Sequence, residues 1–163
     1  MSDTIHEGGC ACGSLRYEAQ GEPIFVNNCH CRLCQRQTGG TSVVNGFWES
    51  DRVTVTQGEL TEHTLKGGSG GEHVIRRCAQ CGTAVFSHYP RVGRLGVGVR
   101  IGSFDDPTPF TPTAVVFTAY KMPWVTLPEG IPAFEEYYSP RELYSPESFA
   151  RLMVLVEKNA AEG

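Results

Sequence analysis

The chain has 163 residues, of which 40% are hydrophobic and 20% are charged, and these values are ordinary for a folded globular protein. Folding at this length buries roughly 70% of the surface of the unfolded chain, so we expect one domain with its own core. Eighteen acidic and fourteen basic residues give a net charge of −4, and the basic residues form no stripe. This balance excludes nucleic acid as an expected partner.

The longest apolar run, at residues 152–156, is far shorter than the ~20 residues that a membrane-spanning helix needs. The first twenty residues contain charged side chains and no apolar stretch, so we expect no secretory signal and no membrane partner. The sequence therefore predicts a cytoplasmic protein whose cysteines are kept reduced. Nothing in the sequence predicts an oligomeric state.

The chain begins with a polar segment, residues 1–9, which we interpret as a loose tail with a turn at its two glycines. Nineteen glycines and ten prolines indicate frequent turns and hence short strands. Glycine and serine at residues 67–71 predict a hairpin tip. Apolar, alternating or β-branched patterns predict strands at residues 14–19, 24–26, 41–48, 53–57, 60–66, 73–77, 83–89, 95–101 and 113–120.

Two helices are expected among these strands. Residues 32–38 predict a short helix that two glycines end, and a proline-rich irregular segment occupies residues 123–140. Ser145 is a good N-cap with Pro146 in the first helical position, so a second helix is predicted to begin here. Its apolar residues recur at helical spacing over about four turns, at Phe149, Leu152, Met153 and Val156. The predicted fold class is mainly β with a C-terminal helix.

Seven cysteines are the most informative feature of the composition. They form three clusters, which are Cys10 and Cys12, then Cys29, Cys31 and Cys34, then Cys78 and Cys81. An odd number of cysteines in a reducing compartment argues against a framework of disulfides. Two thiolates a few residues apart can bind one metal ion at about 2.3 Å, so the clusters predict metal binding rather than inert buried cysteine.

Seven thiols are too many for one tetrahedral site and one short of two, which suggests a closed site of four and an open site of three. The turn Cys78-X-X-Cys81-Gly82 is typical of a chelating knuckle, with glycine easing the tight turn. Its partner is either Cys10-X-Cys12-Gly13 or two cysteines of the middle cluster. Because the middle cluster can supply three ligands by itself, the simplest partition leaves Cys29, Cys31 and Cys34 around a metal with an open position.

Three segments follow one another in a specific order, namely Gly9-Cys10-Ala11-Cys12-Gly13-Ser14-Leu15-Arg16-Tyr17, Cys29-His30-Cys31-X-X-Cys34-Gln35-Arg36 and Cys78-X-X-Cys81-Gly82-Thr83. In this order they resemble the glutathione-dependent formaldehyde-activating enzyme (GFA) family, which also includes centromere protein V. The resemblance covers about residues 8–135. It includes further matches at Gly102-Ser103-Phe104-Asp105, Pro123-Trp124 and Gly130-Ile131-Pro132-Ala133-Phe134.

The resemblance implies a β-tent zinc fold, in which antiparallel sheets are pinned by zinc bound to four cysteines. Together with the predicted helix, it gives a GFA-like zinc-binding domain at residues 8–135 and a C-terminal extension at residues 136–163 packed on the same domain. It also implies two zinc ions. The structural ion is bound by Cys10, Cys12, Cys78 and Cys81, and the catalytic ion is bound by Cys29, Cys31 and Cys34.

Zinc bound by three thiolates is a weak Lewis acid, so its open position suits an incoming thiol better than water. A thiol bound there becomes a thiolate, which can add to an aldehyde carbon or leave when a carbon–sulfur bond breaks. The resemblance implies glutathione and a formaldehyde-type aldehyde, hence a carbon–sulfur lyase like S-(hydroxymethyl)glutathione synthase. The carboxylates of glutathione need cations, and Arg32 and Arg36, beside the middle cysteines, are the candidates.

The alternative function is a non-catalytic zinc module that binds a protein partner or senses metal or redox state. The count of three cysteines favours the enzyme, because a purely structural site is normally completed by a fourth side chain. His30 lies between two cysteines and is a candidate donor or acid beside the metal. His63, His73 and His88 lie on predicted strands, where we interpret them as exposed or hydrogen-bonded side chains rather than ligands.

Overall fold

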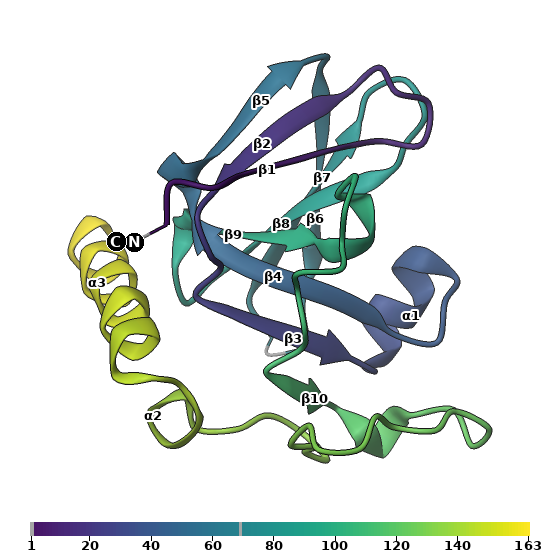
Figure 1. Cartoon of the computed structure of the whole chain (residues 1–163), viewed down its shortest axis with the longest axis vertical. Coiled ribbons are helices and arrows are strands. Elements are labelled where there is room, and N and C mark those ends of the chain that lie inside the picture. The colour runs from purple at the N-terminus through teal and green to yellow at the C-terminus, as the bar shows by residue number, and fades with distance from the viewer. Residues whose placement is uncertain (1, 69) are drawn as a thin grey trace.

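The computed structural model describes residues 2–68 and 70–163 (Figure 1). Its helices are α1 (Arg32–Thr38), α2 (Pro140–Leu143) and α3 (Pro146–Glu162). Its strands are β1 (Ile5–Gly9), β2 (Arg16–Gln20), β3 (Phe25–Cys29), β4 (Val43–Glu49), β5 (Val53–Gln57), β6 (Leu60–Lys66), β7 (Glu72–Cys78), β8 (Ala84–Tyr89), β9 (Gly93–Arg100) and β10 (Ala114–Val116). The prediction of a mainly β protein with a C-terminal helix is confirmed.

The strands form two sheets. The smaller sheet has the order β1-β2-β5, and the larger has the order β10-β3-β4-β9-β8-β7-β6. All pairs are antiparallel except β10 and β3, which run parallel with Ala114 opposite Asn27. This parallel pair departs from the expected antiparallel sheets, because a long connection carries the chain from β9 across the molecule to the far edge of β3 (Figure 1).

The main core lies between the two sheets. The smaller sheet contributes Tyr17 of β2 and Leu15, which directly precedes β2. The larger sheet contributes Trp48 and Phe86, and all four side chains are at most 1% exposed. Tyr17 and Phe86 meet edge to face with ring centroids 5.0 Å apart, and Trp48 donates its indole N–H to the carbonyl of Gly21 at 2.9 Å. Alternation along β4 sends Trp48 into this core and Val43 into a second cluster on the opposite face.

The second hydrophobic cluster joins α3 to the larger sheet. Leu152 and Leu155 of α3 are buried in it, while Arg151 forms a bidentate ion pair with Glu49 of β4 at 2.6 and 2.7 Å. Ser145 caps the helix by accepting a hydrogen bond from the N–H of Ser148 at 3.1 Å, as the sequence predicted. The boundary between residues 135 and 136 stays a prediction. No helix in the described part of the chain combines the length and apolar composition needed to cross a bilayer.

The interpretation of residues 1–9 as a loose tail is wrong for the part that the structure describes, because Ile5–Gly9 pairs with β2 over five residues. The two glycines mark a close approach rather than a turn, since a Cβ on Gly8 would lie 2.4 Å from the hydroxyl of Tyr17. Met1 lies outside the described residues. The polar sequence of β1 does not predict a strand, because backbone pairing with β2 rather than an apolar pattern holds this segment in place.

The strand predicted at residues 113–120 is shorter than expected. β10 ends at Val116 because Phe117 adopts a left-handed backbone with φ of 57°, after which Thr118–Tyr120 forms a turn of 3₁₀ helix. The predicted hairpin tip is supported by the N–H of Gly67, which donates to the carbonyl of Gly71 at 2.8 Å. Ser69, within this tip, lies outside the described residues.

We expect Gly46→Ala to destabilise the sheet, because an added Cβ would lie 2.6 Å from Trp48 and 2.8 Å from Ile101. Such overpacking lowers the free energy of unfolding by about 1–3 kcal/mol. Gly102→Ala is the matched control, since no heavy atom lies within 4 Å of its added Cβ. Chemical denaturation compares the two variants with the unaltered protein, and equal stability of the two variants would contradict this packing.

Candidate metal centres

Two groups of cysteines gather in space although they are spread along the chain. In the four-cysteine group, Cys10, Cys12, Cys78 and Cys81, all sulfurs lie within 4.8 Å of one another. The same holds in the three-cysteine group, which is Cys29, Cys31 and Cys34. Of the two pairings that the sequence left open for the Cys78 knuckle, the structure therefore has the one with Cys10 and Cys12.

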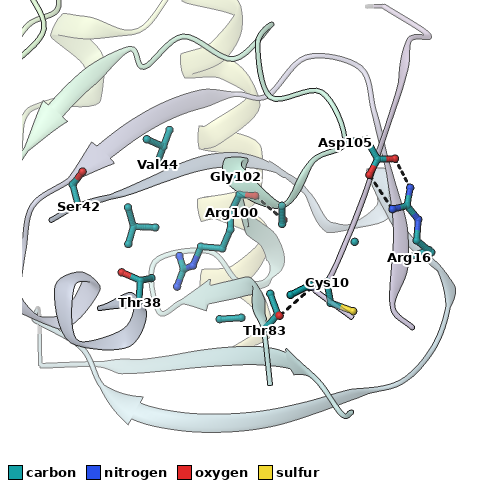
Figure 2. A pocket seen from close by; sticks show the side chains of 14 residues that line it. Cys10, Arg16, Thr38, Ser42, Val44, Thr83, Arg100, Gly102 and Asp105 are labelled. Atoms are coloured by element: carbon teal, nitrogen blue, oxygen red, sulfur yellow. Dashed lines mark hydrogen bonds and ion pairs between the residues drawn. The ribbon is translucent and has the colours of Figure 1, made fainter. Parts of the chain in front are cut away.

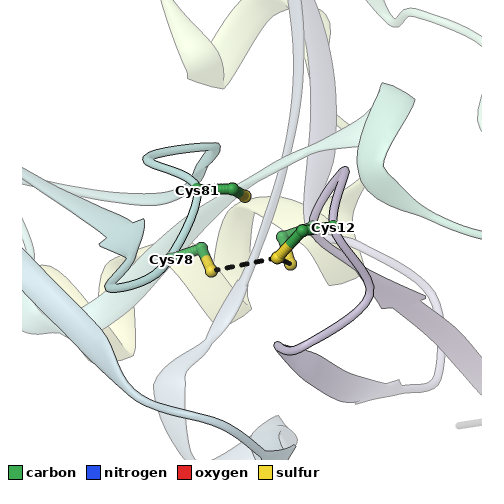
Figure 3. A group of neighbouring side chains, drawn as sticks. Cys12, Cys78 and Cys81 are labelled. Atoms are coloured by element: carbon green, nitrogen blue, oxygen red, sulfur yellow. Dashed lines mark hydrogen bonds between the residues drawn. The ribbon is translucent and has the colours of Figure 1, made fainter.

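The spacing of the sulfurs in the four-cysteine group fits one tetrahedral ion (Figure 3). The sulfur of Cys12 lies 3.5 Å from that of Cys10 and 4.0 Å from that of Cys78, and all of these thiols are free. Ligands about 2.3 Å from a tetrahedral ion lie roughly 3.8 Å from one another. The group could therefore hold a metal ion.

Two similar turns position these four cysteines. The N–H of Gly13 donates to the carbonyl of Cys10 at 3.2 Å, and the N–H of Gly82 donates to the carbonyl of Cys78 at 2.9 Å. Both glycines are left-handed, with φ of 79° and 77°, a conformation that other residues adopt only with strain. The glycine that follows each cysteine pair in the sequence thus indicates a tight turn, and each turn directs the two sulfurs of its pair toward the other pair.

Hydrogen bonds prepare this group for thiolate chemistry. Burial opposes ionisation of Cys10, but the N–H of Leu15 and the thiols of Cys12 and Cys78 bond to its sulfur and lower its pKa to about 7. The hydroxyl and N–H of Thr83 lower the pKa of Cys81 to about 5. These donors stabilise negative charge on sulfur, which is the form that binds metal.

The three-cysteine group is built at one strand-to-helix junction. Cys29 ends β3, Cys31 is the N-cap of α1, and Cys34 lies in the first turn of that helix. The sulfur of Cys31 accepts a hydrogen bond from the N–H of Cys34 at 3.4 Å. Gln35 fixes the junction by donating to the carbonyls of His30 and Tyr120 at 2.8 and 3.0 Å.

The three sulfurs share negative charge unequally. Hydrogen bonds from the thiols of Cys29 and Cys34 lower the pKa of Cys31 to about 2, whereas contacts with Cys31 and Cys34 raise the pKa of Cys29. Three thiolates close together repel one another, so a cation is needed to ionise them all. Thiolate donors are soft and suit Zn²⁺ or Cu⁺ better than Mg²⁺ or Ca²⁺. This group could also hold a metal ion.

The four histidines named in the sequence do not join either cysteine group in the described part of the chain. His63 is exposed on β6, and the Nδ1 atom of buried His88 lies 2.8 Å from the carbonyl oxygen of Gly96. The interpretation of His73 as exposed or hydrogen-bonded is wrong, because its ring is buried without a hydrogen bond to any described residue and stacks on Tyr89 with ring centroids 4.4 Å apart. Burial lowers the pKa values of His30 and His73, the latter to about 4, so both rings are neutral near pH 7.

Arg32 and Arg36 lie on the exposed side of α1. The guanidinium of Arg32 donates to the side-chain carbonyl of Gln35 on the same helix. Their predicted role in binding carboxylates stays a prediction.

Sequence reasoning missed Arg100, which is only 6% exposed at the end of β9. It donates to the side-chain carbonyls of Asn45 and of Gln37, the latter at 2.9 Å. The signal that could have identified it is its place in the alternation of β9, where it shares a face with Gly96 and Gly98.

A cavity of about 580 Å³ opens beside Arg100 (Figure 2). Four hydroxyl side chains are among the residues that line it, namely Thr38, Ser42, Thr83 and Ser103. Cys10 borders the cavity, whereas none of the cysteines of the three-cysteine group does. Arg16 and Asp105 also line it and form a bidentate ion pair with each other.

Comparison with known proteins gives one family match. The family described as glutathione-dependent formaldehyde-activating enzyme matches residues 5–120, which is more than half of the chain and includes all seven cysteines. Among solved structures, the chain is similar to a Rhodobacter sphaeroides protein that was a Northeast Structural Genomics target. The two chains are 17% identical, with 78% of this chain and 98% of that chain covered at a TM-score of 0.48.

We expect Cys78→Ser to destabilise the metal-loaded protein strongly, because an ion in the four-cysteine group links turns 66 residues apart. Calorimetry should show a thermal transition lower by roughly 10 °C or more. In the unaltered protein, removal of the metal by a chelator should lower the thermal transition by a similar amount. Native stability and full metal content in Cys78→Ser would show that this group does not hold the fold together.

We expect Cys31→Ser to have a much smaller effect on stability, because the three-cysteine group spans one local junction and cross-links little of the chain. Elemental analysis should show the loss of one metal equivalent, while the thermal transition stays within about 4 °C. If Cys31→Ser unfolds globally while Cys78→Ser stays stable, the three-cysteine group is the structural site and this assignment of the two groups is wrong.

Proposed function

Because the chain belongs to the glutathione-dependent formaldehyde-activating enzyme family, we propose that it is a zinc enzyme that joins a thiol such as glutathione to a small aldehyde such as formaldehyde. The four-cysteine group would hold a structural zinc ion and the three-cysteine group a catalytic one. The observation that carries this proposal is the difference of one ligand between the two groups. It is a carbon–sulfur lyase in this proposal, since the reverse reaction breaks a carbon–sulfur bond.

The three-cysteine group fits a catalytic role through its donor set. Zinc bound by three thiolates would offer one further coordination position and lower the pKa of a thiol placed there. Cys29 and Cys34 are buried, at 8% and 4% exposed, and keep water from most of the group. Cys31 is only partly buried, so it marks the side from which a ligand approaches.

The proposed reaction needs no oxidant or reductant. The thiol sulfur forms a bond to the carbonyl carbon, and the π-electron pair of the C=O bond moves to oxygen. The proton of the thiol ends on that oxygen, which gives a hydroxymethyl thioether. Since all atoms of both reactants stay in the product, the chain has to supply only binding, orientation and a low thiol pKa.

The alternative, a non-catalytic zinc module, needs a fourth side chain to complete the three-cysteine group. Among the described residues, no fourth histidine, cysteine, aspartate or glutamate donor lies within 4.8 Å of all three sulfurs. An open position therefore supports the enzyme over the module. Arg32 and Arg36 remain the candidates from the sequence for contacts with the carboxylates of glutathione.

Cobalt substitution tests the open position directly. We expect glutathione to strengthen the sulfur-to-metal charge-transfer band of the cobalt protein, because it adds a fourth thiolate to the three-cysteine group. Cys31→Ser should lose this response. S-methylglutathione keeps the carboxylates but cannot supply a thiolate, so it should leave the band unchanged. If no thiol alters the band, the enzyme proposal fails and the non-catalytic module is the better account.

A further inference from the structure

Arg100 is a buried cation without an anionic partner among the described residues. It is 6% exposed, and its guanidinium donates hydrogen bonds to the neutral amide oxygens of Asn45 and Gln37. No described carboxylate forms an ion pair with it. Burying an unpaired charge is costly, so this guanidinium is a strong candidate for binding an anion from outside the chain.

The cavity places Arg100 where a ligand can reach it (Figure 2). Three charged residues line this space of about 580 Å³, and two of them, Arg16 and Asp105, neutralise each other. Arg100 is therefore left as the positive charge of a cavity that is otherwise lined by hydroxyls, small residues and valines. Guanidinium with nearby hydroxyl donors is suited to a carboxylate.

The cavity adjoins the three-cysteine group through three neighbouring residues. Gln37, which accepts a hydrogen bond from Arg100, lies one helical turn after Cys34 on α1. Thr38 lines the cavity and donates its hydroxyl to the carbonyl of Cys34 at 3.0 Å. Val43 lines the cavity and pairs with Cys29 across β4 and β3.

We propose that Arg100 binds a carboxylate of the substrate thiol within this cavity, an inference that rests on the proposed function. A small peptide thiol separates its sulfur from its carboxylates by several bonds, so one molecule can occupy both Arg100 and the neighbouring three-cysteine group. The ligand class is thus an anionic thiol. A neutral thiol of similar reactivity would bind only to the metal, and Arg100 would add nothing to its affinity.

The test measures thiol affinity from the charge-transfer band of the cobalt protein, which does not depend on turnover. We expect Arg100→Gln to weaken glutathione binding roughly 10- to 100-fold, the effect of losing a charge-assisted hydrogen bond to carboxylate. Binding of the neutral thiol 2-mercaptoethanol should be unchanged. Arg100→Lys should recover part of the affinity. The double variant Arg16→Gln with Asp105→Asn is the matched control, because it removes a neutralised pair and leaves the net charge of the cavity unchanged.

A change to the ligand provides the second measurement, which does not depend on the folding of a variant. Glutathione diethyl ester keeps the thiol and removes both carboxylate charges, so it should bind the unaltered protein more weakly than glutathione. Arg100→Gln should bind the acid and the ester equally. If acid and ester bind the unaltered protein equally, the inference is wrong.

Other outcomes separate this inference from the proposed function. If Arg100→Gln lowers the affinities for glutathione and 2-mercaptoethanol equally, the proposed carboxylate contact is wrong. Arg100 would then act on the charge of the cysteine group. Weakened glutathione binding in Arg32→Ala with Arg36→Ala, but not in Arg100→Gln, would overturn it in favour of the exposed arginines. If no thiol binds the unaltered protein, the proposed function fails and this inference fails with it.

Discussion

The constraint on which we expect the rest of the structure to depend is the meeting of four sulfurs from two turns that lie 66 residues apart in the chain. One turn leads into β2 of the smaller sheet, and the other joins β7 and β8 of the larger sheet. The contact therefore ties the two sheets together beside the main core, to which Cys78 itself belongs. The end of β9, next to β8, places Arg100 at the cavity that Cys10 of the four-cysteine group borders.

The two cysteine groups differ in how far they connect the chain and in charge. The four-cysteine group joins distant turns, so a change in its ligands would disturb both sheets. The three-cysteine group lies within one strand-to-helix junction, and its Cys29 and Cys34 pack in the second hydrophobic cluster rather than in the main core. A divalent ion with three thiolates would carry one negative charge, and one with four thiolates would carry two.

Local features of this protein were predictable from the sequence, and features set by distant contacts were not. Spacing identified three cysteine clusters and left two pairings open for the Cys78 knuckle, and the family resemblance implied the pairing with Cys10 and Cys12 that the structure has. Ser145 with Pro146 identified the start of α3. β1 was missed because its polar residues are held by pairing with β2. The left-handed backbone of Phe117 that ends β10, and the burial of Arg100 between α1 and β4, depend on packing that no local pattern reports.

The central claim is that one metal site is complete and the other has room for a thiol. Zinc X-ray absorption spectroscopy on protein loaded with two zinc ions tests it most directly. We expect an average of about 3.5 sulfurs per zinc, with a lighter donor completing one site, and a rise to about four sulfurs when glutathione is added. An unchanged sulfur count with saturating glutathione, or four sulfurs per zinc before its addition, would contradict the account.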